Sequence, residues 1–190
     1  MKFLDKSTIK LDKVENELDN LVLDFVKILE KYTKYVIVSD YVVILFGRAR
    51  ATEDIDIFIE KMNPNQFKNF FKELEGNSYY CLNSDDARDM HEHLEEGLAL
   101  RFAKKGSIIP NFEIKFVKRE INAEALRNPL KVVLPSGEVL ISNIEQQIAF
   151  KRYFLKSDKD LEDAEHLEKV FEGKLDKNLI QHYKKIIDAL

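Results

Sequence analysis

The segment "YVIVSDYVVILFGRARATEDIDIFIEKM" (residues 35–62) holds the residues that decide the fold. Its first part, "YVIVS", is a short apolar run, which predicts a strand buried inside a sheet. Its last part, "DIDIFIE", alternates acidic and apolar residues with a period of two, as a strand does. The intervening "YVVILFG" fits either a strand or a helix, and its final glycine is typical of a helix C-terminus. The segment therefore predicts two strands, separated by an ambiguous element and a turn that carries Arg48 and Arg50.

Two aspartates stand inside the second predicted strand, where aspartate is disfavoured. Because side chains alternate along a strand, Asp54 and Asp56 should emerge on one face about 7 Å apart. Neighbouring carboxylates repel each other unless a cation lies between them, and Mg²⁺ binds such carboxylates while keeping positions for water and phosphate. The pair therefore indicates phosphoryl-transfer chemistry with bound metal ions. The alternative is a solvated edge strand whose acids pair with lysines.

A third acid for such a site usually comes from a neighbouring strand. The alternating run "NFEIKF" offers Glu113 near its start. This glutamate is either a third metal ligand or an ordinary surface acid, and the sequence leaves both readings open.

The composition is that of a globular protein of one domain. The chain has 190 residues, of which 45% are hydrophobic and 34% charged. No stretch reaches the length of a membrane span, the start lacks a signal-peptide core, and the single cysteine, Cys81, excludes an internal disulfide. These features predict a cytoplasmic protein with no membrane contact. The formal charge of −4 does not favour a nucleic-acid binder that depends on bulk charge.

The rest of the chain alternates between predicted helices and strands. Asp12 and Glu15 predict a capping box for a helix over residues 12–33. His91 and His93 bracket a glutamate, which would suggest zinc, but at this spacing they face apart on a helix and no further ligand lies nearby, so we expect surface histidines instead. Other predicted elements are a helix over 64–75, a strand and a helix within 77–100, paired strands over 98–104 and 112–118, a hairpin over 130–142, and helices beginning near Ser142, Ser157 and Asp176.

Three motifs together resemble a known family. The order "SD", thirteen residues (41–53) and "DID" resembles the nucleotidyltransferase superfamily of the DNA polymerase beta type. More narrowly, "GRARATEDIDIF" is similar to the R-x-T-x-D-x-D stretch of abortive-infection-type nucleotidyltransferase toxins and their archaeal and bacterial relatives. Those proteins also carry a late lysine helix and a Lys-Asp-x-x-Asp segment, which "EQQIAFKRYFLKSDKDLEDAEHL" matches. The resemblance covers roughly residues 35–170.

The resemblance implies an α/β (α+β) nucleotidyltransferase fold, with a mixed β-sheet flanked by helices and a C-terminal helical segment. It divides the chain into a nucleotidyltransferase-like core, residues 1–140, and C-terminal helices, residues 141–190, that complete the cleft within one compact unit. The implied function is transfer of a nucleoside monophosphate from a nucleoside triphosphate to a hydroxyl of RNA, protein or a small molecule, with a toxin-like role and an antitoxin-like partner.

The resemblance also implies a role for each matching residue. Asp54, Asp56 and Glu113 would bind Mg²⁺ or Mn²⁺, and Glu113 would also be a candidate base. The nucleotide would be contacted by Ser39, Arg50, Thr52, Lys151 and Lys159, and Asp160 would be a catalytic acid-base or positioning group.

Asp40 departs from the family pattern, which has Gly-Gly or Gly-Ser where this chain has Ser39 and Asp40. An aspartate brings negative charge to the place where a triphosphate is expected, although it is also a good helix N-cap. Two hypotheses follow. Either the chain is an active transferase, or it is a catalytically impaired nucleotidyltransferase fold that serves as a binding or scaffold protein.

Overall fold

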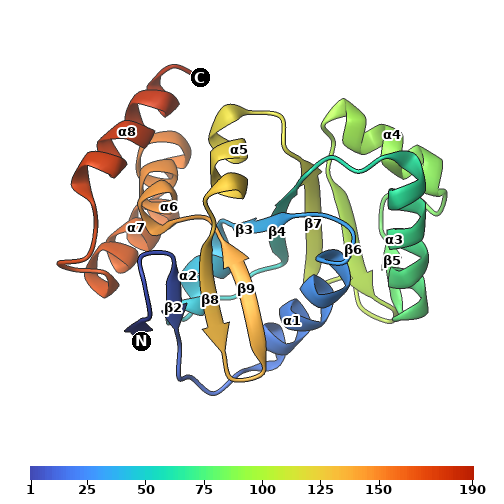
Figure 1. Cartoon of the computed structure of the whole chain (residues 1–190), viewed down its shortest axis with the longest axis horizontal. Coiled ribbons are helices and arrows are strands. Elements are labelled where there is room, and N and C mark those ends of the chain that lie inside the picture. The colour runs from blue at the N-terminus through green and yellow to red at the C-terminus, as the bar shows by residue number, and fades with distance from the viewer.

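The two strands predicted within residues 35–62 lie side by side near the middle of a nine-stranded sheet (Figure 1). The computed structural model describes residues 1–190. β3 (Tyr35–Val38) and β4 (Asp54–Ile59) are antiparallel, and β4 is parallel to β7 (Asn111–Phe116). The sheet is mixed and has the strand order β1-β2-β8-β9-β3-β4-β7-β6-β5. The remaining strands are β1 (Lys2–Phe3), β2 (Thr8–Lys10), β5 (Tyr79–Cys81), β6 (Leu100–Lys104), β8 (Leu130–Leu134) and β9 (Gly137–Ile141).

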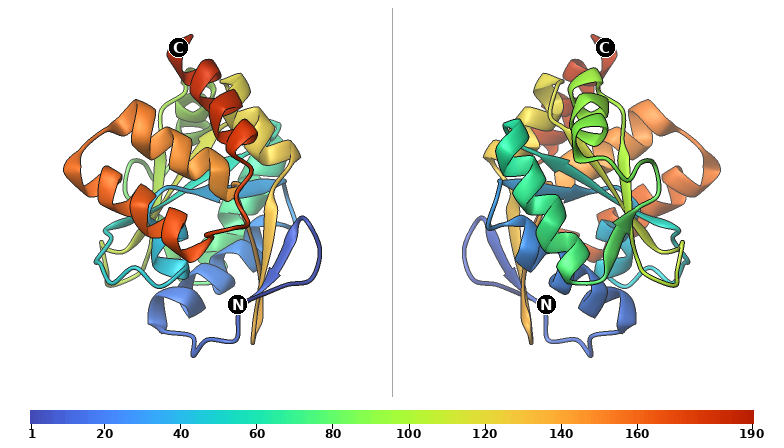
Figure 2. Two further views of the ribbon diagram at one scale, coloured as in Figure 1. Left: turned by 90° about the vertical axis from the view of Figure 1, so that its left-hand side faces the viewer. Right: turned by 90° about the vertical axis from the view of Figure 1, so that its right-hand side faces the viewer.

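Two groups of helices lie at opposite ends of the molecule. Figure 2 shows α6, α7 and α8 at one end of the molecule and α3 and α4 at the other. The ambiguous "YVVILFG" segment forms helix α2 (Asp40–Leu45). The other helices are α1 (Glu17–Leu29), α3 (Pro64–Gly76), α4 (Ala87–Glu96), α5 (Glu120–Arg127), α6 (Ile144–Phe150), the π-helix η1 (Lys151–Leu155), α7 (Asp158–Val170) and α8 (Lys177–Asp188).

The two faces of β4 have different chemistry. Ile55, Ile57 and Ile59 are buried in the main hydrophobic core, together with Phe25 of α1 and Phe112 of β7, whose rings stack with centroids 3.8 Å apart. Asp54, Asp56 and Phe58 point to the opposite face. Because β4 and β7 are in parallel register, Asp56 lies opposite Glu113 and Phe58 lies opposite Lys115. The alternation read from the sequence therefore places the acids together on one side of the sheet.

The first long helix is shorter than predicted, because its capping box involves other residues. α1 begins at Glu17 with Asn16 as N-cap, and the side chains of Asn16 and Asp19 each accept a hydrogen bond from the other's backbone N–H. Glu15 is not part of the box, since its carboxylate accepts hydrogen bonds from Ser136. The predicted bounds of 12–33 were wrong at both ends, since the helix spans Glu17–Leu29.

Two further predictions need correction, and three elements were missed. The first C-terminal helix is capped by Asn143 rather than Ser142, whereas Ser157 and Asp176 are N-caps as predicted. His91 is buried, with Nε2 2.9 Å from the carbonyl oxygen of Met62, so its assignment to the surface was wrong. The strands β1 and β2 and the helix α5 were not predicted at all. None of the helices combines the length and apolar character needed to cross a membrane.

Candidate functional site

The carboxylates of Asp54 and Asp56 form a pair that no Lys or Arg side chain neutralises. Both residues are partly buried on the same face of β4. Lys115 and Arg101, the basic residues of the neighbouring strands, form their ion pairs with Glu113 instead. Two acids are thus held side by side without a protein counter-charge, on the common face that the sequence pattern predicted.

The pKa values of the pair reflect this uncompensated charge. Burial raises the pKa of Asp56 to about 6, and repulsion from Asp54 and Glu113 adds to the effect. Burial also raises the pKa of Asp54, followed by repulsion from Glu113 and Asp40. A divalent cation with oxygen ligands would remove this repulsion, so the chemistry of the pair fits Mg²⁺ or Mn²⁺.

Glu113 lies beside the pair, but its carboxylate is already engaged. Lys115 Nζ lies 2.5 Å from Oε1, and Arg101 Nε donates to Oε2 at 3.0 Å. Burial would raise the pKa of Glu113, yet these two cations outweigh burial and lower it. A metal ion would reach Glu113 only if one of the cations released it, and the lowered pKa makes this residue a poor proton acceptor.

Ser39 has a backbone conformation that favours glycine. It follows β3 with φ 65° and ψ −135°, and its N–H donates to Oε1 of Gln147 at 3.2 Å. A positive φ is costly for a residue with a Cβ atom, so the surrounding contacts must impose it. The motif that the sequence resembles has glycine at this position, where a positive φ carries no such cost.

Ser39→Gly is expected to raise the free energy of unfolding by about 1 kcal/mol, because glycine adopts this conformation without a steric penalty. Urea denaturation measures the change. Ser78, which also has a positive φ of 63° but lies away from the site, provides the matched variant Ser78→Gly. A loss of stability in Ser39→Gly alone would show that the serine side chain contributes more than its backbone strain costs.

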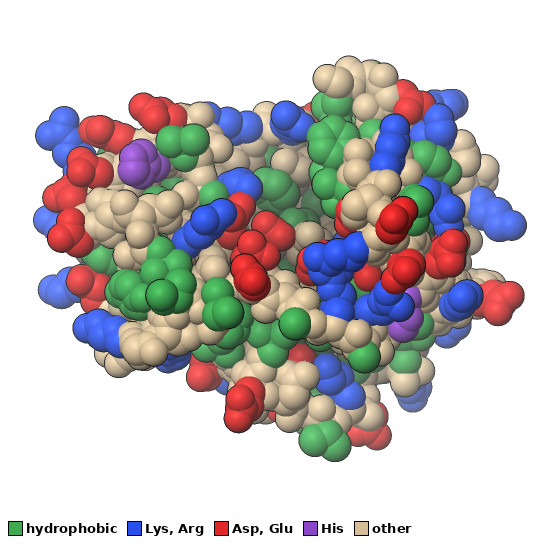
Figure 3. Space-filling model, turned by 180° about the vertical axis from the view of Figure 1, so that it is seen from behind, with side chains coloured by type: hydrophobic (Ala, Val, Ile, Leu, Met, Phe, Trp, Pro, Cys, Tyr) green, Lys and Arg blue, Asp and Glu red, His purple; other side chains and the backbone are tan.

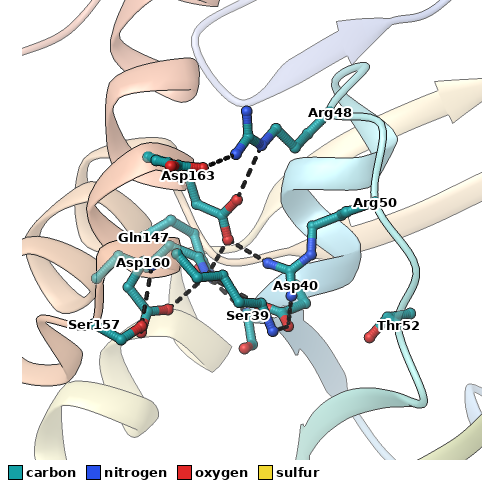
Figure 4. A network of polar contacts seen from close by, with 12 residues as sticks. Ser39, Asp40, Arg48, Arg50, Thr52, Gln147, Ser157, Asp160 and Asp163 are labelled. Atoms are coloured by element: carbon teal, nitrogen blue, oxygen red, sulfur yellow. Dashed lines mark hydrogen bonds and ion pairs between the residues drawn. The ribbon is translucent and has the colours of Figure 1, made fainter.

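A second cluster of charges lies next to the pair and connects α2, the turn before β4, and α7 (Figure 4). Lys151 is its centre, with an exposed fraction of only 1%. Its Nζ lies 2.9 Å from Oδ1 of Asp40, 2.9 Å from Oδ2 of Asp163 and 3.2 Å from Oδ1 of Asp160. Arg50 also bridges Asp40 and Asp163, at 2.6 and 2.5 Å. We call these five residues the buried charge cluster.

Asp40 has a different role from the one its sequence suggests. It is the first residue of α2 rather than its N-cap, so the capping interpretation was wrong. Its carboxylate contacts Arg50, Lys151 and, at 3.1 Å, Lys159. Burial lowers the pKa of Lys151, but the contacts with Asp163 and Asp40 outweigh burial and raise it, so the amine stays charged. Arg50, Lys151 and Lys159 are the three cations expected to contact phosphate. Each of them is thus paired with at least one acid.

The buried charge cluster does not offer a metal site, although three carboxylates meet there. Oxygen atoms of Asp40, Asp160 and Asp163 lie within 4.8 Å of one another. The ammonium group of Lys151 contacts all three of these residues, so it already supplies the cation that the acids need.

Two other predicted residues have local structural contacts. The hydroxyl of Thr52 donates to the main-chain oxygen of Asp54 at 2.9 Å, which supports the turn before β4. Figure 4 shows Thr52 apart from the charge cluster. Asp160 accepts a hydrogen bond from the hydroxyl of Ser157, the N-cap of α7.

A cavity of about 610 Å³ opens beside Asp56. Its polar wall includes three basic residues that the sequence interpretation missed. Lys115 lies within β7, and Lys118 and Arg119 lie between β7 and α5, a helix that was not recognised. The run "KFVKRE" was the available signal, since it places lysine and arginine directly after the strand of Glu113. The lining residues used below are Ser39, Asp56, Phe58, Lys115, Lys118, Arg119, Ile121, Gln147 and Phe150.

Comparison with known proteins identifies similar structures. No family model and no curated protein matches the chain. A nucleotidyltransferase-like antigenic protein from Paracoccidioides brasiliensis has a similar structure, with a TM-score of 0.52 and 12% identity over 89% of this chain and 86% of that chain. JHP933 from Helicobacter pylori gives a TM-score of 0.47 and 17% identity, over 91% and 75% of the two chains. The first similarity confirms the predicted nucleotidyltransferase-like α/β fold.

Proposed function

We propose that this protein is a metal-dependent nucleotidyltransferase that moves a nucleoside monophosphate from a nucleoside triphosphate to an acceptor hydroxyl. The observation that carries the proposal is the pair Asp54 and Asp56, held without a counter-charge next to a cavity of about 610 Å³. In the reaction the acceptor oxygen bonds to the α-phosphorus, the bond to pyrophosphate breaks, and the hydroxyl proton passes to solvent.

Asp54 and Asp56 would hold Mg²⁺ or Mn²⁺, which when bound would neutralise charge on the transferred phosphoryl group. Glu113 keeps Lys115 and Arg101 beside the pair and would join the ligands only after losing one of them. Ser39 directs its backbone N–H to Gln147, which keeps the end of β3 close to α6. The chain thus fixes the carboxylates on a rigid strand and leaves the adjoining space for substrate.

The acceptor class follows only from the resemblance to toxins, which favours RNA or protein and an antitoxin-like partner. A cytoplasmic location, expected from the single cysteine, belongs to the same proposal.

A second candidate function is a binding or scaffold role without catalysis. The observation that favours it is Asp40, whose carboxylate pairs with Arg50, Lys151 and Lys159. Asp40 thus offsets part of the positive charge that these cations would offer to phosphate. A protein with this role would keep the fold but would not bind a nucleotide with metal.

Thermal unfolding with each of the four nucleoside triphosphates, with and without Mg²⁺ or Mn²⁺, separates the two functions. We expect a metal-dependent rise in stability with at least one nucleotide, reaching about 2.7 kcal/mol at a ligand concentration one hundred times Kd. The rise should be absent in Asp54→Ala. If no nucleotide stabilises the wild type, the transferase proposal fails, and restored binding in Asp40→Gly would identify Asp40 as the reason.

A further inference from the structure

The cavity beside Asp56 and the buried charge cluster lie toward different ends of β4. Arg50 belongs to the turn that precedes Asp54, whereas the cavity is lined further along by Asp56, Phe58 and, on β7, Phe116. No residue of the buried charge cluster lines the cavity. The carboxylate pair therefore stands between two regions, one filled with paired charges and one hollow.

Nucleotidyl transfer assigns these two regions to different substrates. The inference rests on the transferase function proposed above, in which Asp54 and Asp56 hold the metal at the α-phosphate. The attacking and leaving oxygens lie roughly in line at the transferred phosphorus, so the acceptor and the pyrophosphate occupy opposite sides. Arg50, Lys151 and Lys159 are the cations expected to contact the phosphates, which leaves the cavity to the acceptor.

The lining of the cavity carries little net charge. Lys115 is already paired with Glu113 at 2.5 Å, and Glu96 lines the cavity together with Lys118 and Arg119. Figure 3 shows Lys and Arg side chains mixed with acidic ones on the face drawn, without a continuous basic track. A nucleic-acid strand depends on such a track for its affinity. The cavity therefore suits an uncharged occupant better than a strand of RNA.

Apolar side chains form another part of the wall. Phe58 and Phe150 are only partly buried, and both line the cavity together with Ile121. Phe58 follows Asp56 on the same face of β4, at about 7 Å along the strand. Aromatic side chains in such a place stack on planar rings. The volume of about 610 Å³ lies within the range of small-molecule sites, so the cavity fits one ring-bearing molecule.

Gln146 supplies a directed hydrogen-bond acceptor in the same wall. It lies on α6, is 6% exposed and lines the cavity. Its Nε2 donates to the main-chain oxygen of Ile121 at 2.8 Å, and because that oxygen can only accept, the amide is fixed in this orientation. Its Oε1 is buried and accepts no hydrogen bond within the protein.

The neighbouring Gln147 shows the contrast. Its Oε1 accepts from the backbone N–H of Ser39, and its Nε2 donates to the hydroxyl of Ser142, so both ends of its amide are used within the protein. A buried oxygen without a partner is costly. A ligand that brings an O–H or N–H donor to Gln146 removes this cost and gains affinity from it.

We propose that the cavity is the acceptor site, and that the acceptor is a small molecule of the nucleoside class. Its planar ring lies against Phe58 and Phe150, and an O–H or N–H group donates to Oε1 of Gln146. One of its hydroxyl oxygens bonds to the α-phosphorus, pyrophosphate leaves, and the hydroxyl proton passes to solvent. This acceptor differs from the RNA or protein that the resemblance to toxins favours, and the test includes an RNA strand.

Isothermal titration with adenosine, guanosine, cytidine and uridine tests the assignment. The protein is first saturated with Mg²⁺ and an α,β-methylene nucleoside triphosphate, which occupies the donor site and cannot transfer its nucleotide. At least one nucleoside should bind, and Gln146→Met should raise its Kd about tenfold, because a buried hydrogen bond is lost. Gln181→Met, at an exposed position of α8, should change this Kd by less than about twofold.

Binding of the triphosphate analogue separates a local loss from a damaged fold. Its Kd should change by less than about twofold in Gln146→Met, since the phosphates lie outside the cavity. Phe58→Ala keeps the assignment testable if Gln146→Met does not fold, because loss of the stacking surface should also raise the nucleoside Kd about tenfold.

The assignment is overturned if no nucleoside binds while the triphosphate analogue does, or if the folded cavity variant binds the nucleoside as tightly as the wild type. A hexanucleotide RNA that binds at least about tenfold more tightly than the nucleoside would also overturn it and would identify RNA as the acceptor. In these cases the transferase function stands, provided that Asp54→Ala abolishes the metal-dependent binding of the analogue. If the wild type does not bind the analogue, the transferase function fails and the acceptor assignment fails with it.

Discussion

Lys151→Met is expected to lower the free energy of unfolding by about 3–5 kcal/mol. The lysine is 1% exposed and contacts Asp40, Asp160 and Asp163. Methionine fills similar space but carries no charge, so Asp160 would lose its ion pair, and Asp40 and Asp163 would keep Arg50 as their shared cation. Removing one partner from a buried ionic network is costly because the remaining charges have lost their solvation and their counter-charge.

Lys159→Met is the matched control for this variant. Lys159 also pairs with Asp40, at 3.1 Å, but its side chain is 60% exposed. Exposed ion pairs contribute little, so we expect a loss below about 1 kcal/mol. Urea denaturation of both variants measures the difference. If Lys151→Met is as stable as Lys159→Met, the contacts of Lys151 within the buried charge cluster do not stabilise the fold, and a direct role toward phosphate gains support.

Asp56→Asn is expected to stabilise the metal-free protein at pH 7 by up to about 3 kcal/mol. The pKa of Asp56 is raised from an ordinary value of 3.8 to about 6, by burial first and then by Asp54 and Glu113. The folded protein therefore disfavours the ionised form that prevails at pH 7. Asparagine occupies the same space without the charge, although it would remove a ligand that the proposed metal needs.

The same variant predicts a specific pH dependence. Between about pH 4 and pH 6 the folded wild type holds a proton on Asp56 that the unfolded chain has lost, so its stability falls as pH rises through this window. Asp56→Asn should lack this decrease. Asp85→Asn, at an exposed position, serves as the control and should follow the wild type. Parallel curves for Asp56→Asn and the wild type would mean that Asp56 is not held in an unfavourable ionised state.

The sequence was informative where local pattern determines the structure. Alternation in "DIDIFIE" predicted both the strand and the common face of Asp54 and Asp56, because period two is imposed by strand geometry. The helix assignment of "YVVILFG" could not be predicted, because a short, fully buried apolar run fits both elements. The N-terminus of α1 depended on which of several acids and amides formed the capping box. Glu15 does not take part, because its carboxylate accepts hydrogen bonds from Ser136, far along the chain.

The charges around the site were harder to predict, because pairing depends on segments far apart in the chain. Asp40 and Lys151 are separated by 111 positions, and nothing in either motif indicates that they meet. The sequence therefore suggested that Asp40 would bring negative charge to the triphosphate position and that Lys151 would contact the nucleotide, but not that the two side chains pair with each other. Likewise, Lys118 and Arg119 drew no attention because α5, which completes the cavity, has a weak local signal.

The central claim is that Asp54 and Asp56 bind a divalent cation, and electron paramagnetic resonance of Mn²⁺ tests it most directly. Titration of the wild type with Mn²⁺ in the presence of a nucleoside triphosphate should show protein-dependent loss of the free Mn²⁺ signal beyond the loss caused by nucleotide alone. The account predicts that this additional loss is absent in Asp54→Ala and retained in Asp85→Asn. Equal Mn²⁺ binding by the wild type and Asp54→Ala would contradict it.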